Sequence, residues 1–134
     1  MNNADKPGFY REAYRALKPG GVLALSNLCL GNGDPLVYPV PWAETPATSF
    51  LATPAEMEAD LRAAGFAIEM FRDTSEEVRP TQRRNRERLE REGLGALGTH
   101  LIMGERLLEM QINSSRNLED GAVATIEALV RKPG

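Results

Sequence analysis

The chain has 134 residues, with sixteen Lys and Arg against nineteen Asp and Glu, 42% hydrophobic residues and a formal net charge of −3. This balance argues against disorder and against a general nucleic-acid binder, which needs a basic surface to neutralise phosphates. No apolar run approaches the roughly 20 residues that span a bilayer, so we expect one soluble, cytoplasmic domain. Because the chain has one Cys and one His, we expect neither an intramolecular disulfide nor a metal site.

The first thirty residues predict a helix and then a strand. Residues 5–17 place apolar side chains on one side of a helix that Asp5 can cap, and a Lys-Pro-Gly-Gly turn at 18–21 ends it. Residues 22–28 are almost continuously apolar, so we expect a buried strand at the centre of a sheet.

Five of the nine prolines fall between residues 31 and 54, together with Tyr38, Trp42 and Phe50. This stretch is too long for a simple connection and too aromatic for a solvated linker. Two interpretations are equally open: the aromatic side chains form a wall for a ligand, or they anchor the loop to the core.

A second helix and strand follow this loop. Residues 53–56 read Thr-Pro-Ala-Glu, a capping box with proline at the first helical position, so a helix begins at Pro54. Phe66, Ile68 and Met70 alternate and predict the buried side of a strand over residues 66–72.

Three further elements are predicted in the second half of the chain. Residues 76–92 hold six Arg and five Glu, which indicates a solvated helix, kinked or begun near Pro80. Residues 105–118 predict a helix with Leu108, Ile112 and Ser115 on one side, and residues 122–131 alternate as a long strand with small inner side chains.

Residues 93–98 match the G-x-G-x-x-G pattern of dinucleotide-binding loops. That chemistry requires a strand before the loop and a helix N-terminus after it, whereas here a charged helix comes first. We therefore expect an interhelical turn rather than a nucleotide site.

Two side chains could carry chemistry directly. His100 is the one group that titrates near neutral pH; it is either an acid or base, or a packed histidine with satisfied ring nitrogens. Cys29 could be a nucleophile with His100 as its base, but nothing supplies a third orienting group, so a buried structural thiol is the better interpretation.

The order of these elements resembles the C-terminal half of a class I S-adenosylmethionine-dependent methyltransferase, of the small-molecule, sarcosine/dimethylglycine branch. The resemblance rests on residues 9–21, which end in Leu-Lys-Pro-Gly-Gly, on the Gly-Phe pair at 65–66, and on the segments 38–42, 98–104 and 116–118. It implies an α/β, partial Rossmann-like fold of about three strands with flanking helices, whose terminal strand inserts antiparallel between the other two.

The resemblance also implies what this chain lacks. Family members hold S-adenosylmethionine with a glycine-rich loop and residues after the first four strands, and none of these is present, so we expect the cofactor not to bind this chain in the usual way. Residues 31–53 correspond to a substrate-side loop and residues 76–118 to a helical insertion. We expect Tyr38, Trp42, Phe50 and Asn113 to bind the substrate and His100 to be the catalytic residue.

The missing half would leave one edge of the strand at 22–28 bare and apolar. We therefore expect a homodimer, or a complex with a chain that supplies the missing half, joined at that edge. The alternative to an incomplete methyltransferase is a non-enzymatic dimerisation or regulatory module that uses the same edge.

Overall fold

The structure, a computed structural model, describes residues 3–33, 35–92 and 99–134; between residues 99 and 107 it describes the side chain of Arg106 alone. These residues divide into two compact units, which we treat separately. Unit 1 comprises residues 1–31, 50–74 and 124–134, and unit 2 comprises residues 32–49 and 75–123. Unit 2 thus contains most of the loop and the helical insertion that the sequence sets apart.

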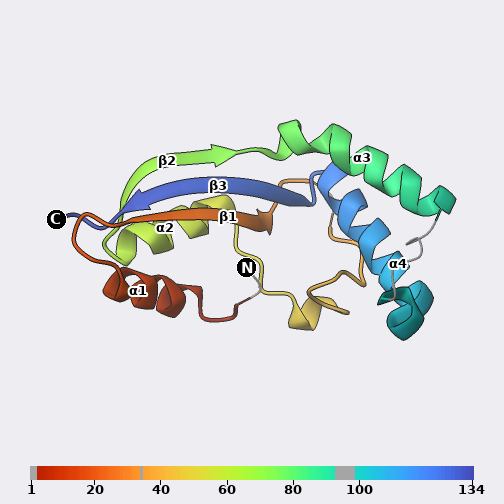
Figure 1. Cartoon of the computed structure of the whole chain (residues 1–134), viewed down its shortest axis with the longest axis horizontal. Helices are drawn as coiled ribbons and strands as arrows, with labels where there is room; N and C mark the ends of the chain where they lie inside the picture. Colours follow the sequence, from red (N-terminus) through yellow and green to blue (C-terminus); the bar gives the residue numbers. More distant parts are fainter. Residues whose placement is uncertain (1–2, 34, 93–98) are drawn as a thin grey trace. The chain divides into compact units, whose positions relative to one another are not determined.

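Unit 1 is built on a three-stranded sheet with the strands β1 (Val22–Leu30), β2 (Ala67–Asp73) and β3 (Val123–Arg131) in the order β1-β3-β2 (Figure 1). β3 is antiparallel to β2. It is also antiparallel to β1, because Gly21 at the start of β1 bonds to Lys132 at the end of β3, while Gly33 beyond β1 bonds to Gly121 ahead of β3. The predicted insertion of the terminal strand between the other two is confirmed.

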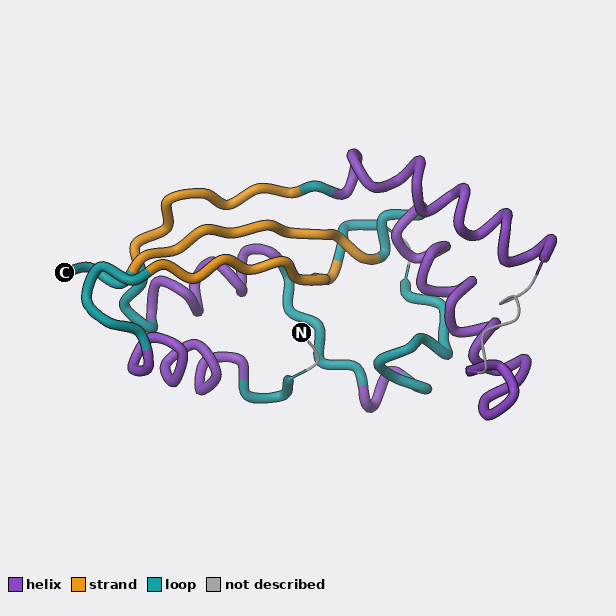
Figure 2. Tube along the Cα trace, viewed as in Figure 1, coloured by secondary structure: helices purple, strands orange, loops and turns teal. Residues whose placement is uncertain are grey.

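Helices α1 (Lys6–Ala16) and α2 (Pro54–Ala63) cover one face of this sheet (Figures 1 and 2). Both predicted caps are present: the Asp5 carboxylate accepts from Gly8 N at 3.1 Å, and the Thr53 hydroxyl accepts from Glu56 N at 3.1 Å. The core beneath the helices consists of Tyr10, Cys29, Met57, Leu61, Phe66, Ile126, Ala128 and Val130.

Two sequence predictions about the strands are wrong. β1 is an edge strand rather than a central one, because it pairs with β3 on one side only. It is also not fully buried: Val22, Ala24 and Ser26, on the face with no helix over it among the described residues, are exposed. In β2, a register irregularity between Ile68 and Met70 turns Phe71 toward the core and leaves Met70 39% exposed. Hydropathy alternation alone cannot show such a bulge.

Unit 2 pairs the loop with two helices, α3 (Ser75–Glu92) and α4 (Thr99–Glu119). The loop itself holds one turn of 3-10 helix, η1 (Pro46–Thr48). α3 confirms the helix predicted over residues 76–92, and of the two alternatives for Pro80 a start there is wrong, since the helix begins at Ser75 with Pro80 inside it. α3 also packs along α4 rather than being fully solvated. Residues 93–98, the glycine-rich stretch, lie outside the described residues.

α4 is longer than predicted and buries a different side. Ser115 is buried as expected, but Leu108 and Ile112 are half-buried, whereas Met110, Asn113 and Asn117 are buried. Polar side chains occupy the inner side of the helix because they bind backbone groups of the loop. Gly121, with φ +76°, ends the segment as predicted for a helix C-terminus.

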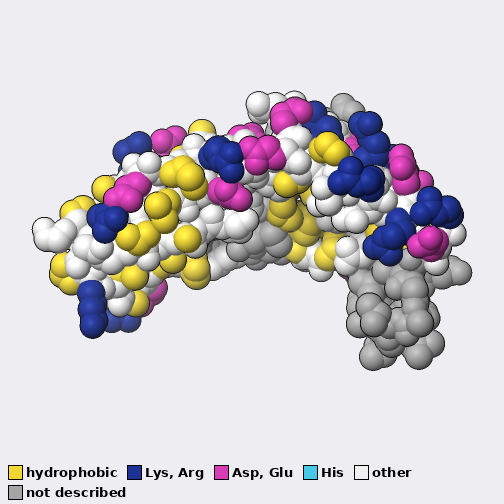
Figure 3. All heavy atoms as spheres, turned by 45° about the horizontal axis from the view of Figure 1, so that its top comes forward, with side chains coloured by type: hydrophobic (Ala, Val, Ile, Leu, Met, Phe, Trp, Pro, Cys, Tyr) yellow, Lys and Arg dark blue, Asp and Glu magenta, His cyan; other side chains and the backbone are white. Residues whose placement is uncertain are grey.

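On the face of the unit 1 sheet opposite α1 and α2, charged pairs alternate with hydrophobic side chains (Figure 3). Arg72 pairs with Glu127 at 3.2 Å, and Arg131 pairs with Glu69. In the described part of the chain, no helix is long and apolar enough to cross a membrane.

Candidate functional site

A pocket of about 140 Å³ lies in unit 1, where the first turns of α1 meet the second half of β1 and the start of α2. Its lining includes the polar side chains of Asn3, Lys6, Tyr10 and Asn27 and the apolar ones of Phe9, Leu25 and Met57. None of the five site residues expected from the sequence is among its described lining residues.

Lys6, the first residue of α1, supplies the positive charge of the pocket. Its Nζ donates to the carbonyl of Asn3 at 2.6 Å and to the carbonyl of Phe50. Burial lowers the pKa of this ammonium. An ammonium has three N–H donors, and these two carbonyls engage two of them.

Tyr10 and Asn27 form a polar pair in the same pocket. The Nδ2 of Asn27 lies 3.9 Å from the sulfur of Met57, and Asn27 also lies near Tyr10, where it acts to lower the pKa of the tyrosine. Burial raises the pKa of Tyr10 to about 12, so the hydroxyl keeps its proton at neutral pH. Asn27 is the one signal that could have revealed the pocket, since it is an amide inside a strand that is apolar apart from it and Ser26.

Cys29 is a structural thiol rather than a nucleophile. It is 2% exposed, and its sulfur lies 3.8 Å from the sulfur of Met57. Burial raises the pKa of the thiol to about 11, so almost none of the reactive thiolate forms at neutral pH. The preferred interpretation from the sequence is confirmed.

These groups suit positioning better than proton transfer. The Tyr10 hydroxyl and the Cys29 thiol both stay protonated at neutral pH, and none of the described lining residues is a carboxylate or a histidine. The pocket therefore offers an ammonium, an amide and a hydroxyl to a small polar molecule, and no acid–base pair. Among the described residues, no cluster of His, Cys, Asp and Glu could hold a metal ion.

The loop of unit 2 folds into a tight turn that carries Trp42. Val40 N donates to Ala43 O at 2.8 Å and Ala43 N donates back to Val40 O at 3.1 Å, which leaves Pro41 and Trp42 at the tip. Val40 and Ala43 are buried, whereas the indole of Trp42 is half-buried and donates to Ser49 Oγ at 3.3 Å.

Two asparagines of α4 hold this loop. Asn113 donates from Nδ2 to Pro39 O at 2.9 Å, and Asn117 both accepts from Val37 N at 2.8 Å and donates to Val37 O at 3.1 Å. Tyr38, half-buried, lies between these two anchored residues. Asn117 lies in the segment 116–118 that carries the resemblance, but the sequence did not mark it as a site residue, because a buried amide in an amphipathic helix resembles a solvent-facing one.

The structure thus groups three of the expected site residues, Tyr38, Trp42 and Asn113, within unit 2. Phe50 belongs to unit 1, where its side chain is 43% exposed and its carbonyl binds Lys6. The backbone of His100 is part of α4, but its side chain lies outside the described residues.

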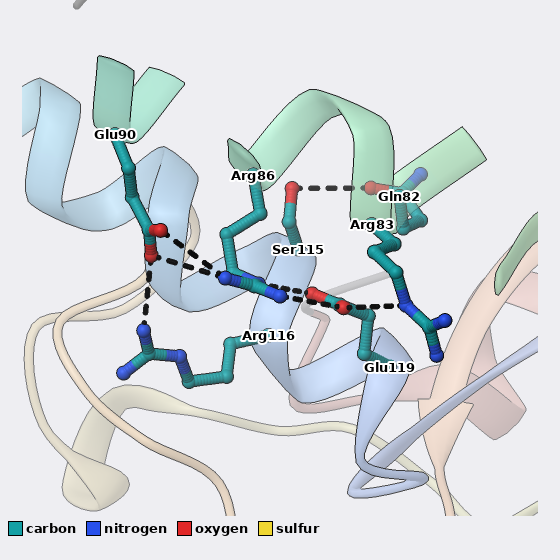
Figure 4. A network of polar contacts seen from close by, with 7 residues as sticks. All are labelled: Gln82, Arg83, Arg86, Glu90, Ser115, Arg116 and Glu119. Atoms are coloured by element: carbon teal, nitrogen blue, oxygen red, sulfur yellow. Dashed lines mark hydrogen bonds and ion pairs between the residues drawn. The ribbon is translucent and has the colours of Figure 1, made fainter. Parts of the chain in front are cut away.

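An ion-pair network fixes α3 to α4 inside unit 2 (Figure 4). Its centre is Arg86, whose Nε and Nη2 donate to the two carboxylate oxygens of Glu119 at 2.5 and 3.0 Å. This hydrogen bonding from Arg86 lowers the pKa of Glu119. The network also contains Gln82, Arg83, Glu90, Ser115 and Arg116.

No protein-family model and no curated protein matches the sequence. Solved structures do match nearly the whole chain. Phosphoethanolamine N-methyltransferase 2 from Haemonchus contortus, solved with phosphomonomethylethanolamine and S-adenosylhomocysteine, covers 99% of this chain with 20% identity and a TM-score of 0.71. A sarcosine/dimethylglycine methyltransferase-like protein from Galdieria sulphuraria covers 99% with 15% identity and a TM-score of 0.64.

The cyclase SpnF has a similar structure, covering 97% of this chain with 22% identity and a TM-score of 0.67. The chain spans 31%, 49% and 46% of these three proteins, respectively. At these identities the comparison shows the fold: the chain has the fold of part of an S-adenosylmethionine-dependent, Rossmann-like methyltransferase.

Proposed function

We propose that this chain, with the fold of part of an S-adenosylmethionine-dependent methyltransferase, is the acceptor-binding part of such an enzyme and is inactive without a cofactor-binding part. The observation that carries this proposal is the match of 99% of the chain to 31% of the Haemonchus contortus enzyme. The cofactor-binding part comes from a further segment or from another chain. S-adenosylmethionine, when bound there, supplies the methyl group.

The described residues do not fit the cofactor themselves. β1 is followed by Gly31 and Gly33, but the chain then enters the loop instead of a helix N-terminus. A Cβ on Gly33 would lie 2.3 Å from the carbonyl oxygen of Asp120, so this glycine serves a close backbone approach. We therefore derive no step through the cofactor on this chain.

The pocket around Lys6, Tyr10 and Asn27 is the proposed acceptor site. Methyl transfer mainly requires that the acceptor be held in line with the methyl group, and these side chains can hold a ligand without titrating. Lys6 favours an acceptor with a phosphate or carboxylate. The ligand named for the Haemonchus contortus enzyme carries a phosphate, which agrees with this choice.

Acceptor binding can be measured on the isolated chain by amide NMR. Phosphoethanolamine and sarcosine are the probes, and we expect saturable shifts at Lys6, Tyr10 and Asn27. Asn27→Ala and Lys6→Met should each weaken binding at least tenfold, while Glu12→Gln on the exposed side of α1 is the matched control. Shifts outside the pocket alone, or equal affinity in all three variants, would contradict the proposed site.

A second candidate function is a non-enzymatic assembly or regulatory module. The observation that favours it is the uncharged edge of β1 in the three-stranded sheet.

A further inference from the structure

The arginines of α3 differ in their partners. Arg86 binds a carboxylate of α4 and is the centre of the ion-pair network. Among the described residues, the partners of two others belong to α3 itself: Arg79 donates to Glu76, and Arg84 donates to Thr81 Oγ1 at 3.2 Å. These two guanidinium groups therefore take no part in fixing α3 to α4.

Arg79 and Arg84 line a groove of about 330 Å³ on α3, together with Glu76, Pro80 and Arg83. Starting from Glu76, the five residues stand at the spacings i, i+3, i+4, i+7 and i+8, so their side chains share one side of the helix. The short proline ring leaves room between the long arginine side chains. Three guanidinium groups thus surround the groove together with one carboxylate.

Arg83 can serve the groove and the network at once. Its Nε lies 3.5 Å from Glu119, and Figure 4 shows its two terminal nitrogens turned away from that carboxylate. The Arg83 side chain is 60% exposed. Its terminal N–H groups can therefore reach an anion in the groove while Nε keeps its ion pair.

Glu76 occupies the place of an anion in this groove, and it does so weakly. Both of its carboxylate oxygens accept from one nitrogen, Arg79 Nη1, at 2.7 and 2.8 Å. The strongest pairing would instead set two oxygens against two nitrogens of the guanidinium. Arg79 Nε is buried and has no hydrogen-bond partner among the described residues. Because the Glu76 side chain is 80% exposed, its ion pair contributes little, and a stronger anion can displace it.

We propose that this groove binds the phosphate group of a phosphate monoester, and that Glu76 holds its place in the free chain. A phosphate monoester carries about two negative charges and three acceptor oxygens, which suits three guanidinium groups. A carboxylate ligand would bring no more charge than Glu76 already supplies. α3 begins at Ser75, so the groove starts in its first turn, where the helix dipole favours an anion.

The groove is separate from the proposed acceptor site and does not rest on the proposed function. Its described lining belongs to α3 in unit 2, whereas Lys6, Tyr10 and Asn27 belong to unit 1. One continuous helix supplies this lining. The arrangement of the three guanidinium groups is therefore the same whichever segment or chain provides the cofactor-binding part.

Amide NMR with inorganic phosphate, at constant ionic strength, tests the groove. Saturable shifts are expected at Arg79, Arg83 and Arg84, whereas acetate should give none. Arg84→Gln, at an exposed position, should weaken phosphate binding about fivefold or more. Arg88→Gln removes the same charge from an exposed position of α3 outside the groove, and it should change the Kd less than about twofold.

Glu76→Gln gives the sharpest result. Loss of the competing carboxylate should tighten phosphate binding about threefold or more, whereas a Glu76 that serves only the stability of α3 would leave the affinity unchanged. An absence of saturable shifts in α3, equal losses in Arg84→Gln and Arg88→Gln, or unchanged affinity in Glu76→Gln overturns the proposal. Lys6→Met should leave phosphate binding at α3 intact, which separates this result from a failure of the acceptor site.

Discussion

The side-chain amide of Asn117 binds the backbone of Val37 through both of its polar atoms, as a neighbouring strand would. Oδ1 accepts from Val37 N at 2.8 Å and Nδ2 donates to Val37 O at 3.1 Å, and Asn117 is 1% exposed. This pair, with Asn113 and Pro39, ties the proline-rich loop to α4. The loop is therefore fixed by side chains, since it has no sheet to join.

Asn117→Ala should lower the free energy of unfolding by about 1–3 kcal/mol, because it leaves the polar groups of Val37 without their partner. Urea unfolding followed by circular dichroism measures the change. Glu109→Ala, at an exposed position of the same helix, is the control and should change stability by less than about 0.5 kcal/mol. Equal stability of the two variants would show that the pair does not hold the loop.

Glu119 should make the stability of unit 2 depend on acid pH. Its pKa is lowered by the Arg86 hydrogen bonds, so its folded-state pKa lies below the unfolded value of 4.5. Its stabilisation is complete above the unfolded pKa and is lost as the pH falls through the folded-state pKa. At pH 7 the melting temperature of Glu119→Gln should be lower than that of the parent. Between pH 7 and pH 2 it should then fall less steeply than the melting temperature of the parent. Glu87→Gln, on the exposed side of α3, should follow the parent; a Glu119→Gln curve parallel to it would contradict the assignment.

Cys29 should resist thiol reagents until the protein unfolds. Burial of Cys29 keeps reagents from reaching its sulfur, and its pKa of about 11 keeps the fraction of thiolate low at neutral pH. Reaction with Ellman's reagent should be slow in buffer and fast in concentrated urea. Met57→Ala, which opens space beside the sulfur, should speed the reaction at least tenfold in buffer. A parent protein that reacts at the rate of a free thiol would show that this part of the core is open.

Elements governed by local chemistry could be predicted from the sequence. Asp5 and Thr53 predict the starts of their helices, because the side chain of a cap residue accepts a hydrogen bond from a backbone N–H three positions later. The alternating residues of β3 likewise predict a strand with one inner face, and Ala124, Ile126, Ala128 and Val130 are all buried.

Features that depend on distant partners could not be predicted. The run of β1 is apolar enough for a central strand, and its hydropathy alone does not show that it lies at an edge, which the family resemblance implied. Phe71 rather than Met70 faces the core, because the register between β2 and β3 is irregular between Ile68 and Met70. The pocket was missed because Lys6 and Tyr10 of α1 meet Asn27 of β1 only in the folded chain. The role of Asn117 was missed because its partner lies 80 positions away.

The proposal that this chain binds the acceptor and not the cofactor is tested most directly by isothermal titration calorimetry with S-adenosylmethionine. The isolated 134-residue chain should give no saturable heat at millimolar cofactor concentration. Saturable binding with a micromolar Kd and one site per chain would contradict the proposal, because it would place a cofactor site within these residues.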